Sequence, residues 1–450
     1  MLSMYARGMS QRDIASTIEE IYGSDIITDG DTIYYDITLV RRPMCCPFCG
    51  GKMIGHGHKL KLIKHPAVRN CNGIIRYNAN RYRYRECNKT ALEKNPFTFP
   101  GFNSSFLLMQ SAMKLFANLN YTLSMISEEL NISSTQLSKY IDSYITIPPQ
   151  TLPECLGIDE LHSPELSRRN SSYLCILVDN EKRAIYDVLD SRSKTALSLY
   201  FSAFSREDRC CVKYVTIDMW EPYKDIAKVY FPNCIIAVDP FHVIKHLHSN
   251  FERLRIDLMN QCVYGSNAYY LLKKWSWLLV ADDINLDNDY KYNKRFKRML
   301  NRRELRNMIF DSFPTLKLAY ELKEIYRKMN KECSYDEAVK QYDKIAEEFK
   351  HCGIVQYKEF TNILFTWKEE ILNSFLRPYN DRKLSNALTE NINSKQRTYL
   401  SVSRGISNFS RFRKRVLYAL SPNIQYALTS TLTDCNGTGR KRGTYHKIKD

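Results

Sequence analysis

Three short segments, far apart along the chain, each place a carboxylate where a buried site is expected. Asp159 and Asp218 each end a short apolar, β-prone run typical of a buried strand, and Glu390 lies in a helical stretch. Two Mg²⁺ ions held about 4 Å apart for phosphoryl transfer need hard oxygen ligands of this kind. Without metal the three carboxylates would repel one another, so the cluster would bind cations or take up protons. We therefore expect Asp159, Asp218 and Glu390 to hold two Mg²⁺ ions, which Mn²⁺ can replace.

The elements predicted around the two aspartates occur in an informative order. Strands are expected over Tyr173–Val178, Ala184–Leu189 and Cys234–Val238, and helices over Ser191–Phe204 and Tyr223–Tyr230. With the strands that end at Asp159 and Asp218, this gives three strands, a helix, a strand, a helix and a strand. That order is typical of an α/β ribonuclease-H-like core.

A wider set of motifs surrounds these carboxylates. It comprises Gly157-Ile158-Asp159-Glu160, Asp218-Met219 with Tyr223, Phe231-Pro232, Val238-Asp239-Pro240-Phe241-His242-Val243, Ser385-Asn386, Glu390, Asn393, Lys395 and Arg397. With these residues the chain resembles the ISL-three family of bacterial insertion-sequence transposases, from about residue 43 to about residue 420. The resemblance implies a DDE transposase, which binds the ends of an insertion sequence and catalyses Mg²⁺-dependent DNA strand cleavage and strand transfer.

Several residues near the three expected ligands are candidates for auxiliary roles. Asp239 also ends a predicted strand, but Asp218 is preferred because a ribonuclease-H-like core takes its second ligand from the fourth strand. His242 follows in an Asp-x-x-His element, either as a DNA contact or proton shuttle, or as a packing residue behind a helix-capping aspartate. Three further residues lie on the Glu390 helix and suit a scissile phosphate: Asn393, Lys395 and Arg397.

Residues 43–100 form a small zinc-finger-like module that is expected to bind DNA. Cys46 and Cys49 lie across a tight turn, and Cys87 follows the basic–aromatic run Arg81-Tyr82-Arg83-Tyr84-Arg85. The ISL-three family closes this site with a second Cys-x-x-Cys, but Tyr84 stands where its third cysteine is expected. The fourth ligand of a Zn²⁺ ion is therefore open among Cys45, His65 and Cys71, as is loss of the metal. Arg81, Arg83 and Arg85 are expected to face DNA phosphates, and a solvated strand face is the alternative.

Residues 101–150 are expected to form a helix-turn-helix DNA-binding domain. Helices are predicted over Phe106–Phe116, Thr122–Leu130 and Ser133–Tyr144, with Ser133 as the N-cap of the third. Three residues of the third helix are expected to point outward for major-groove recognition: Gln136, Ser138 and Lys139. A generic three-helix packing unit is the alternative.

The other boundaries follow from periodicity and charge. A leader is expected over 1–42, and its first 24 residues resemble a helix-turn-helix segment of Mutator-type transposases or form a plain amphipathic helix. The core is expected in two parts, 151–249 and 381–425, separated by an α-helical insertion over 250–380 in which Lys291 to Arg306 supply many basic residues. A basic, flexible tail is expected over 426–450.

Composition favours a nucleic-acid partner. The 450 residues include 66 Lys and Arg against 49 Asp and Glu, a formal net charge of +17. Such an excess suits double-stranded DNA, here the terminal inverted repeats of an element and its target. The 14 cysteines are mostly scattered, as reduced thiols of a cytosolic protein are, and neither a secretory signal nor a membrane-spanning apolar run is evident. We expect a cytoplasmic, nucleoid-associated bacterial protein without membrane contact, acting on DNA as a homodimer or larger assembly.

The sequence thus predicts a DNA transposase whose N-terminal half binds DNA and whose core cleaves and joins strands. The main alternative is a decayed or repurposed transposase that binds specific DNA without catalysis, an interpretation that the incomplete second cysteine pair supports. A structure-specific nuclease would explain the carboxylates but not the two DNA-binding modules.

Overall fold

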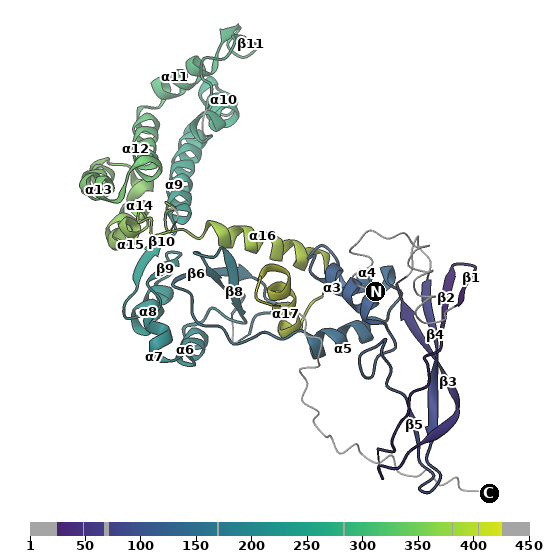
Figure 1. The fold of residues 1–450 in the computed structure, drawn as a ribbon. Coiled ribbons are helices and arrows are strands. Elements are labelled where there is room, and N and C mark those ends of the chain that lie inside the picture. Colours follow the sequence, from purple (N-terminus) through teal and green to yellow (C-terminus); the bar gives the residue numbers. More distant parts are fainter. Residues whose placement is uncertain are drawn as a thin grey trace, which may run out of the picture. The chain divides into compact units, whose positions relative to one another are not determined.

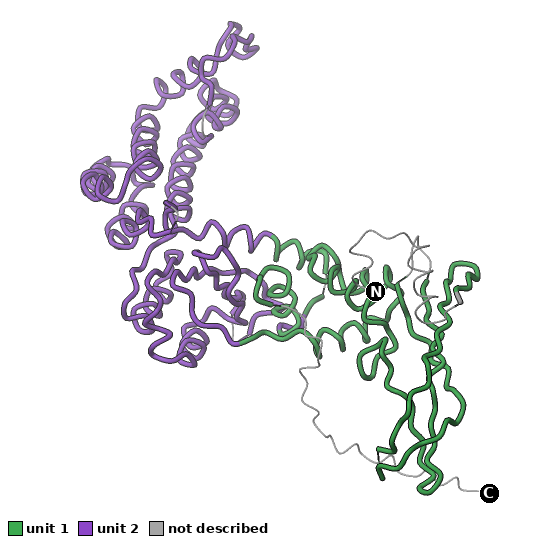
Figure 2. The backbone as a smooth tube through the Cα atoms, in the orientation of Figure 1, with its two compact units in different colours: residues 1–148, 395–406, 410–450 green, residues 149–394, 407–409 purple. Residues whose placement is uncertain are grey.

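The computed structural model describes residues 25–47, 49–66, 72–168, 171–281, 284–379, 381–403 and 405–424. The chain divides into two compact units (Figure 2). Unit 1 comprises residues 1–148, 395–406 and 410–450, and unit 2 comprises residues 149–394 and 407–409. The helix-turn-helix-like segment expected over 1–24 and the basic tail expected over 426–450 lie outside the described residues.

Unit 1 contains a five-stranded sheet centred on a long antiparallel pair, β3 (Ile54–His65) and β4 (Asn72–Arg83). β2 (Thr32–Ile37) pairs with β4 in parallel, β1 (Asp25–Asp29) pairs with β2, and β5 (Thr90–Leu92) pairs with β4. Strands that precede residue 43 therefore share one sheet with the cysteine-rich module, because β2 hydrogen-bonds to β4.

The three helices expected over 101–150 are confirmed, almost to the residue. They are α3 (Phe106–Phe116), α4 (Leu123–Glu129) and α5 (Ser134–Tyr144). Each begins where a hydroxyl side chain accepts a hydrogen bond from a backbone N–H of the first turn: Ser105, Thr122 and Ser133. Local capping thus explains why the sequence located these helices so closely.

The C-terminal helix α17 (Phe409–Leu420) packs against these helices within unit 1. Its Arg415 is buried, and Nη2 donates to the carbonyl oxygens of Asn118 and Tyr121, each at 2.7 Å. The guanidinium carbon also lies 4.0 Å from the ring centroid of Phe116. A buried cation held in this way fixes α17 to the loop between α3 and α4.

Unit 2 contains a mixed five-stranded sheet of order β10-β9-β6-β7-β8. The strands are β6 (Cys155–His162), β7 (Tyr173–Asp179), β8 (Ala184–Leu189), β9 (Tyr214–Ile217) and β10 (Ile235–Val238). β7 runs antiparallel to both of its neighbours, whereas β6, β9 and β10 are parallel to one another. The strands predicted from apolar runs are confirmed. They could be predicted because strands buried on both faces have continuous apolar sequence.

The helices that follow these strands differ slightly from expectation. The helix expected over Ser191–Phe204 is the shorter α6 (Lys194–Ser202), because Ser193 forms its N-cap. The short α7 (Arg206–Cys210), which was not predicted, begins after a second cap at Ser205. The helix expected over Tyr223–Tyr230 is confirmed as α8 (Glu221–Tyr230).

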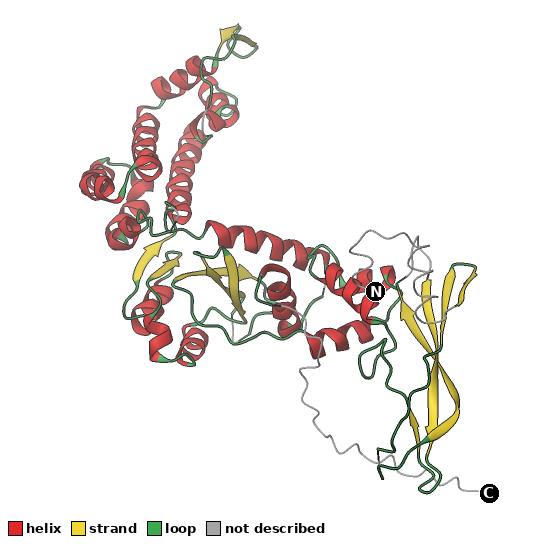
Figure 3. Ribbon diagram, viewed as in Figure 1, coloured by secondary structure: helices red, strands yellow, loops and turns green. Residues whose placement is uncertain are grey.

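The remainder of unit 2 is largely helical, as expected for the insertion. Its helices are α9 (Pro240–Gln261), α10 (Asn267–Lys274), α11 (Arg302–Ser312), α12 (Pro314–Glu332), α13 (Tyr335–His351), α14 (Lys358–Thr366) and α15 (Lys368–Asn373), with two 3₁₀ turns at Ser276–Leu279 and Val355–Tyr357. An unpredicted hairpin, β11 (Lys291–Asn293) with β12 (Arg298–Leu300), interrupts the helices (Figure 3). One apolar core extends from the sheet into these helices.

The last long helix, α16 (Ala387–Val402), begins in unit 2 and ends in unit 1. It confirms the helix expected around Glu390. In the part of the chain that the structure describes, no helix combines the length and the apolar character needed to cross a membrane.

Candidate active site

Three aspartates lie at the same level of three adjacent strands of unit 2. Thr216 on β9 pairs with Gly157 on β6 and with Ala237 on β10. Each of these three paired residues is followed, two positions later, by an aspartate: Asp159, Asp218 or Asp239. The backbone N–H of Asp239 donates to the carbonyl oxygen of Ile217 at 2.8 Å, so the β10–β9 register continues to this level. Because side chains two residues apart point to the same face, the three carboxylates share one edge of the sheet.

Burial dominates the electrostatics of this edge. It raises the pKa of Asp159 and of Asp218 to about 7 and the pKa of Asp239 to about 6. Nearby carboxylates raise these pKa values further: Asp218 and Asp239 act on Asp159, and Glu160 acts on Asp218. Neighbouring buried carboxylates hold protons near neutral pH unless a cation compensates their charge.

The beginning of α16 docks on this edge through Asn386. Its Nδ2 donates to the carbonyl oxygen of Ile158 at 3.0 Å, and its Oδ1 accepts a hydrogen bond from the Thr216 hydroxyl. The backbone N–H of Asn386 also bonds to the Asp239 carboxylate and lowers its pKa. Asn180 completes the network by donating to the Thr216 hydroxyl at 2.7 Å. Residues from four separate parts of unit 2 thus fix where α16 starts.

Gly157 is required for this close approach. A Cβ atom at this position would lie 2.5 Å from Val178 Cγ2 and 2.8 Å from both Asn180 Nδ2 and Asn386 Oδ1. Such distances are well inside van der Waals contact, so any larger residue displaces either β7 or the start of α16. Close packing therefore explains why a glycine stands in the Gly-Ile-Asp-Glu motif.

Glu390 lies in the first turn of α16 and is exposed. Its charge raises the pKa of Asp239 and opposes the lowering of the His242 pKa, so it lies within electrostatic range of these two groups. As a set, however, the oxygens of Asp159, Asp218 and Glu390 do not all lie within 4.8 Å of one another; in the described residues only a cysteine trio does so. The three carboxylates therefore do not form a closed metal cage in this structure.

Asn393, one turn beyond Glu390, links α16 to the first aspartate. Its Nδ2 donates to Asp159 Oδ2 at 3.2 Å and to the carbonyl oxygen of Glu160 at 3.1 Å. Its Oδ1 is buried without a hydrogen-bond partner, as is Asp239 Oδ2. Buried oxygens without a hydrogen-bond partner, beside protonatable carboxylates, are suitable donors for a cation. The all-oxygen donor set fits Mg²⁺ or Mn²⁺.

His242 lies behind Asp239 at the start of α9. Asp239 caps this helix by accepting a hydrogen bond from the Phe241 N–H at 3.4 Å. His242 Nε2 lies 3.9 Å from Asp239 Oδ2, beyond hydrogen-bond distance, and burial lowers the pKa of the imidazole. The capping role of Asp239 is therefore present, while burial disfavours the charged form of His242.

One charged residue at the site was not expected from the sequence. Arg192, in the loop before α6, forms an ion pair with Glu160. Its guanidinium carbon lies 4.0 Å from the ring centroid of Tyr173 and 4.5 Å from that of Trp220. Its charge lowers the pKa of Asp218, against the raising effect of burial. Glu160 was visible in the motif, but no local pattern marks Arg192, because its neighbours come from three separate segments.

The cysteine trio forms in unit 1 as expected. Cys87 Sγ lies 3.6 Å from the Sγ atoms of both Cys46 and Cys49. These three sulfurs all lie within 4.8 Å of one another, which suits thiolate ligation of one tetrahedral ion such as Zn²⁺. The ring of Tyr84 occupies the space beside Gly51, and its hydroxyl donates to Glu86 at 2.8 Å.

The candidates for a fourth ligand are not equally placed. His65 bonds to the Ser105 hydroxyl at 2.9 Å and packs edge-on against Tyr35, and burial lowers its pKa to about 4. The His65 imidazole is therefore held at the start of α3 and does not contact the cysteine trio. Cys45 is exposed in an isolated bridge with Lys52. Cys71 lies outside the described residues.

The residues expected to contact DNA differ in how available they are. Arg81 and Arg85 are exposed, whereas Arg83 Nε is held by the side chain of Asn88 at 2.6 Å. In α5, Gln136 donates to the Ser104 hydroxyl at 2.8 Å and is partly buried, as is Ser138. Lys139 is exposed, with its ammonium 5.3 Å from the ring centroid of Phe102. Lys395 and Arg397 are exposed on the part of α16 that belongs to unit 1.

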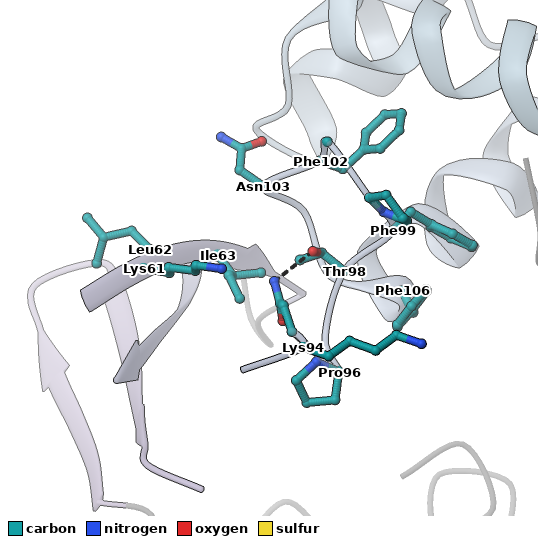
Figure 4. A pocket seen from close by; sticks show the side chains of 13 residues that line it. Lys61, Leu62, Ile63, Lys94, Pro96, Thr98, Phe99, Phe102, Asn103 and Phe106 are labelled. Carbon is teal, nitrogen blue, oxygen red and sulfur yellow. Dashed lines mark hydrogen bonds between the residues drawn. The ribbon is translucent and has the colours of Figure 1, made fainter. Parts of the chain in front are cut away.

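A groove of about 1020 Å³ lies elsewhere in unit 1 (Figure 4). Leu62, Phe99, Phe102 and Phe106 give it an apolar lining, and Asn95 bonds to Thr98 at 2.8 Å across one side. Its described lining includes no carboxylate, histidine or cysteine. The groove is therefore separate from both candidate metal sites.

Comparison with known proteins identifies the family of the chain. Residues 156–416 match the profile of the DDE transposases of the ISL3 (ISL-three) type, described as a transposase family. Because the match covers more than half of the chain, the protein belongs to this family. Over 137 residues the chain is also 28% identical to the transposase for insertion sequence element IS1001 from Bordetella parapertussis. That alignment covers 30% of this chain and 32% of the relative, so it spans about a third of each.

Proposed function

We propose that the protein is a DNA transposase that cleaves the ends of its insertion sequence and joins them to target DNA. The observation that carries this proposal is the alignment of Asp159, Asp218 and Asp239 at one sheet edge, with the Glu390 helix docked beside them through Asn386. Membership of the transposase family supports the same conclusion. A buried acidic edge of this kind serves metal-dependent phosphoryl transfer better than it serves folding stability, because uncompensated buried carboxylates are unfavourable.

The sheet supports a ribonuclease-H-like core. A central β6 has an antiparallel pair on one side and two parallel strands on the other, in the order β10-β9-β6-β7-β8. β6, β9 and the start of α16, which follows the helical insertion, meet at one edge through the contacts of Asn386. Asp159, Asp218 and Glu390, one from each of these three segments, are our proposed ligands of two Mg²⁺ ions.

When bound, the two ions would activate the attacking oxygen and stabilise the leaving oxygen at the scissile phosphate. The chain's own groups prepare the site. Asn393 orients Asp159 through its hydrogen bond, and Arg192 supplies positive charge beside Asp218. Water first attacks the scissile phosphate, and the freed 3′-OH then attacks target DNA in line, without a covalent enzyme intermediate. Lys395 and Arg397, farther along α16, are proposed contacts to the DNA backbone.

Unit 1 is the proposed DNA-end recognition unit. The cysteine trio, as a zinc site, would hold the β4–β5 end of its sheet, with Arg81 and Arg85 against phosphates. The helices α4 and α5 would act as a helix-turn-helix with Lys139 toward the groove. Since two element ends must be joined, we propose that the working form on DNA is a homodimer or larger assembly.

The test is cleavage of a labelled duplex that carries either end of the element encoding this chain, with and without Mg²⁺ or Mn²⁺. Nicking at the element boundary is expected with metal, and its loss is expected in Asp159→Asn, Asp218→Asn and Glu390→Gln while DNA binding is kept. The matched control is Asp187→Asn, because Asp187 is an equally buried strand aspartate that bonds to Tyr200 away from this edge. Wild-type cleavage in the three ligand variants would sink the assignment.

The same experiment with Asp239→Asn tests which aspartate is the second ligand. If Asp239→Asn abolishes cleavage while Asp218→Asn does not, the second ligand comes from β10 rather than β9. Tight binding of element ends with no cleavage in either metal would instead establish the non-catalytic DNA-binding protein, for which the tyrosine at position 84 of the cysteine module is the supporting feature.

A further inference from the structure

The hairpin of β11 and β12 has a composition unlike the rest of unit 2. Five of the ten residues from 291 to 300 are basic and none is acidic: Lys291, Lys294, Arg295, Lys297 and Arg298 are the basic ones. The hairpin lies at the end of the helical segment that is farthest from the five-stranded sheet of the same unit (Figure 1). It is therefore an element of the insertion whose role the carboxylate site does not explain.

The fold of the hairpin is fixed by its inner face. Asn293 and Leu300 are buried, and Asn293 Oδ1 accepts a hydrogen bond from the backbone N–H of Arg295 at 3.0 Å, which closes the turn. Arg295 is in turn held by Asn267 at 2.7 Å and by the carbonyl oxygen of Gly265. The hairpin is thus a packed element and not a loose loop.

The outer face carries an exposed apolar pair. Tyr292 and Met299 are direct partners across the two strands, so their side chains lie on the same face. They are 60% and 53% exposed, respectively. Even as a cross-strand pair, these two side chains leave more than half of their surface in water, which points to a partner with an apolar surface.

The same hairpin carries several cations. In the part of the chain that the structure describes, the ammonium groups of Lys291, Lys294 and Lys297 are exposed and form no hydrogen bond or ion pair. Arg298 is exposed, and its guanidinium bonds to Met308 Sδ at 3.3 Å. Two exposed acidic residues precede the hairpin; Asp287 is paired with Arg303 at 2.6 Å, which leaves Asp289 without an ion pair among the described residues. The hairpin therefore combines a net positive charge with an exposed apolar pair.

We infer that this hairpin is a DNA-binding wedge: its lysines contact phosphates while Tyr292 and Met299 pack against, or between, bases. Charge complementarity selects the partner, because duplex DNA offers dense negative charge directly beside apolar base faces. An acidic protein surface would match the lysines but would leave the apolar pair unused. The inference rests on the proposed function, since it supplies that transposase with a DNA contact distant from its carboxylates.

The test uses the full-length chain and a labelled duplex with 2-aminopurine placed along the element end, and it compares two pairs of variants. Lys291→Ala/Lys294→Ala/Lys297→Ala is matched in charge by Lys317→Ala/Lys331→Ala/Lys340→Ala, three exposed lysines on α12 and α13. Tyr292→Ala/Met299→Ala is matched by Tyr335→Ala/Val339→Ala, an exposed apolar pair on α13. Affinity is measured by anisotropy over a range of salt concentrations, and base unstacking is measured by 2-aminopurine fluorescence.

The hairpin lysine variant should lower the slope of log affinity against log salt by about 0.9 for each phosphate that it no longer neutralises, while its control keeps the wild-type slope. The Tyr292/Met299 variant should bind about tenfold more weakly at unchanged salt slope and should lack the fluorescence increase, which its control retains. Equal slopes in the two lysine variants, or wild-type fluorescence in the Tyr292/Met299 variant, would overturn the wedge. A wild-type chain that binds no duplex overturns it as well. Binding without metal-dependent cleavage overturns only the proposed function, because the salt slopes still decide the role of the hairpin.

Discussion

The side chain of Asn393 donates to Asp159 Oδ2 at 3.2 Å, although the two residues are 234 positions apart. This hydrogen bond joins the helix that carries Glu390 to the strand that carries the first aspartate. A second bond from the same Nδ2 to the Glu160 carbonyl oxygen fixes the orientation of the amide. Asn393 is therefore a positioning residue whose effect passes through Asp159.

Replacing Asn393 should weaken metal binding without unfolding the core. Partners that orient metal ligands typically contribute about 10- to 100-fold to metal affinity or activity, and we expect Asn393→Ala to raise the Mg²⁺ concentration for half-maximal cleavage by a factor in that range. The measurement is cleavage rate against Mg²⁺ concentration. Asn391→Ala, at an exposed position of the same helix, is the control. An unchanged Mg²⁺ requirement in Asn393→Ala would remove it from the site.

The raised pKa values of Asp159 and Asp218 predict how stability depends on pH without divalent metal. Their folded-state pKa of about 7 lies above the ordinary value of 3.8, so between these values the folded chain holds protons that the unfolded chain has released. This contribution is fully present below pH 3.8 and is lost as the pH rises through 7. The melting temperature should therefore fall from pH 5 to pH 8, and Mg²⁺ should raise it more at pH 8 than at pH 5.

Asp159→Asn provides the comparison for that experiment, because the amide does not titrate. Its melting temperature should fall less steeply with pH than that of the wild type, and Mg²⁺ should raise it less at pH 8. Differential scanning calorimetry of both chains in the same buffers removes pH effects from the rest of the protein. Parallel curves for the two chains would show that Asp159 does not carry the titration.

Gly157→Ala should separate α16 from the sheet. Its added Cβ would lie 2.5 Å from Val178 Cγ2 and 2.8 Å from Asn386 Oδ1, and overpacking of this kind typically costs about 1–3 kcal/mol of unfolding free energy. Since Asn386 sets where the Glu390 helix begins, cleavage should fall together with stability. Gly265→Ala is the comparison for a loss of stability without this clash: its Cβ meets open space, its φ of +74° disfavours alanine, and its cleavage should therefore be kept when stability falls. A Gly157→Ala chain with wild-type stability and cleavage would contradict this docking of α16.

Arg192 should tune the pH dependence of cleavage through Asp218. Its charge lowers the pKa of that carboxyl, so Arg192→Gln should shift the pH of half-maximal cleavage upward. Arg192→Lys keeps the charge but loses the stacking between Tyr173 and Trp220, and it should restore the pH profile in part. An identical pH profile in Arg192→Gln and the wild type would assign the residue a structural role through Glu160 alone.

The cysteine trio should retain about one zinc ion per chain after purification. Cys49→Ser or Cys87→Ser should lose it, whereas Cys211→Ser, at an exposed cysteine of unit 2, should not. Metal content by mass spectrometry is the measurement, and Cys45→Ser tests the remaining described candidate for the fourth ligand. His65→Ala should keep zinc, because this ring is bonded to Ser105. A metal-free wild type would mean that the site has lost its ion.

Local sequence patterns located the five strands of the mixed sheet and the three helices α3, α4 and α5. Apolar runs ended by Asp159, Asp218 and Asp239 indicated the strands of the mixed sheet, and Ser133 located the start of α5. The Cys46, Cys49 and Cys87 trio was also expected from spacing and family resemblance. These features follow from residues within a few positions of one another, because periodicity and capping depend on neighbours along the chain.

Only the tertiary structure decided which distant groups meet. Strand register aligned Asp239 with the two expected aspartates, and close packing at Gly157 joined Asn386 to Thr216 and thereby placed the Glu390 helix. Arg192 reached Glu160 because three loops and strands converge there, and the β11–β12 hairpin formed inside a segment whose periodicity had suggested only helix. The contacts of Asn386 join segments more than a hundred residues apart and depend on register and side-chain packing, so no local pattern of a single sequence encodes them.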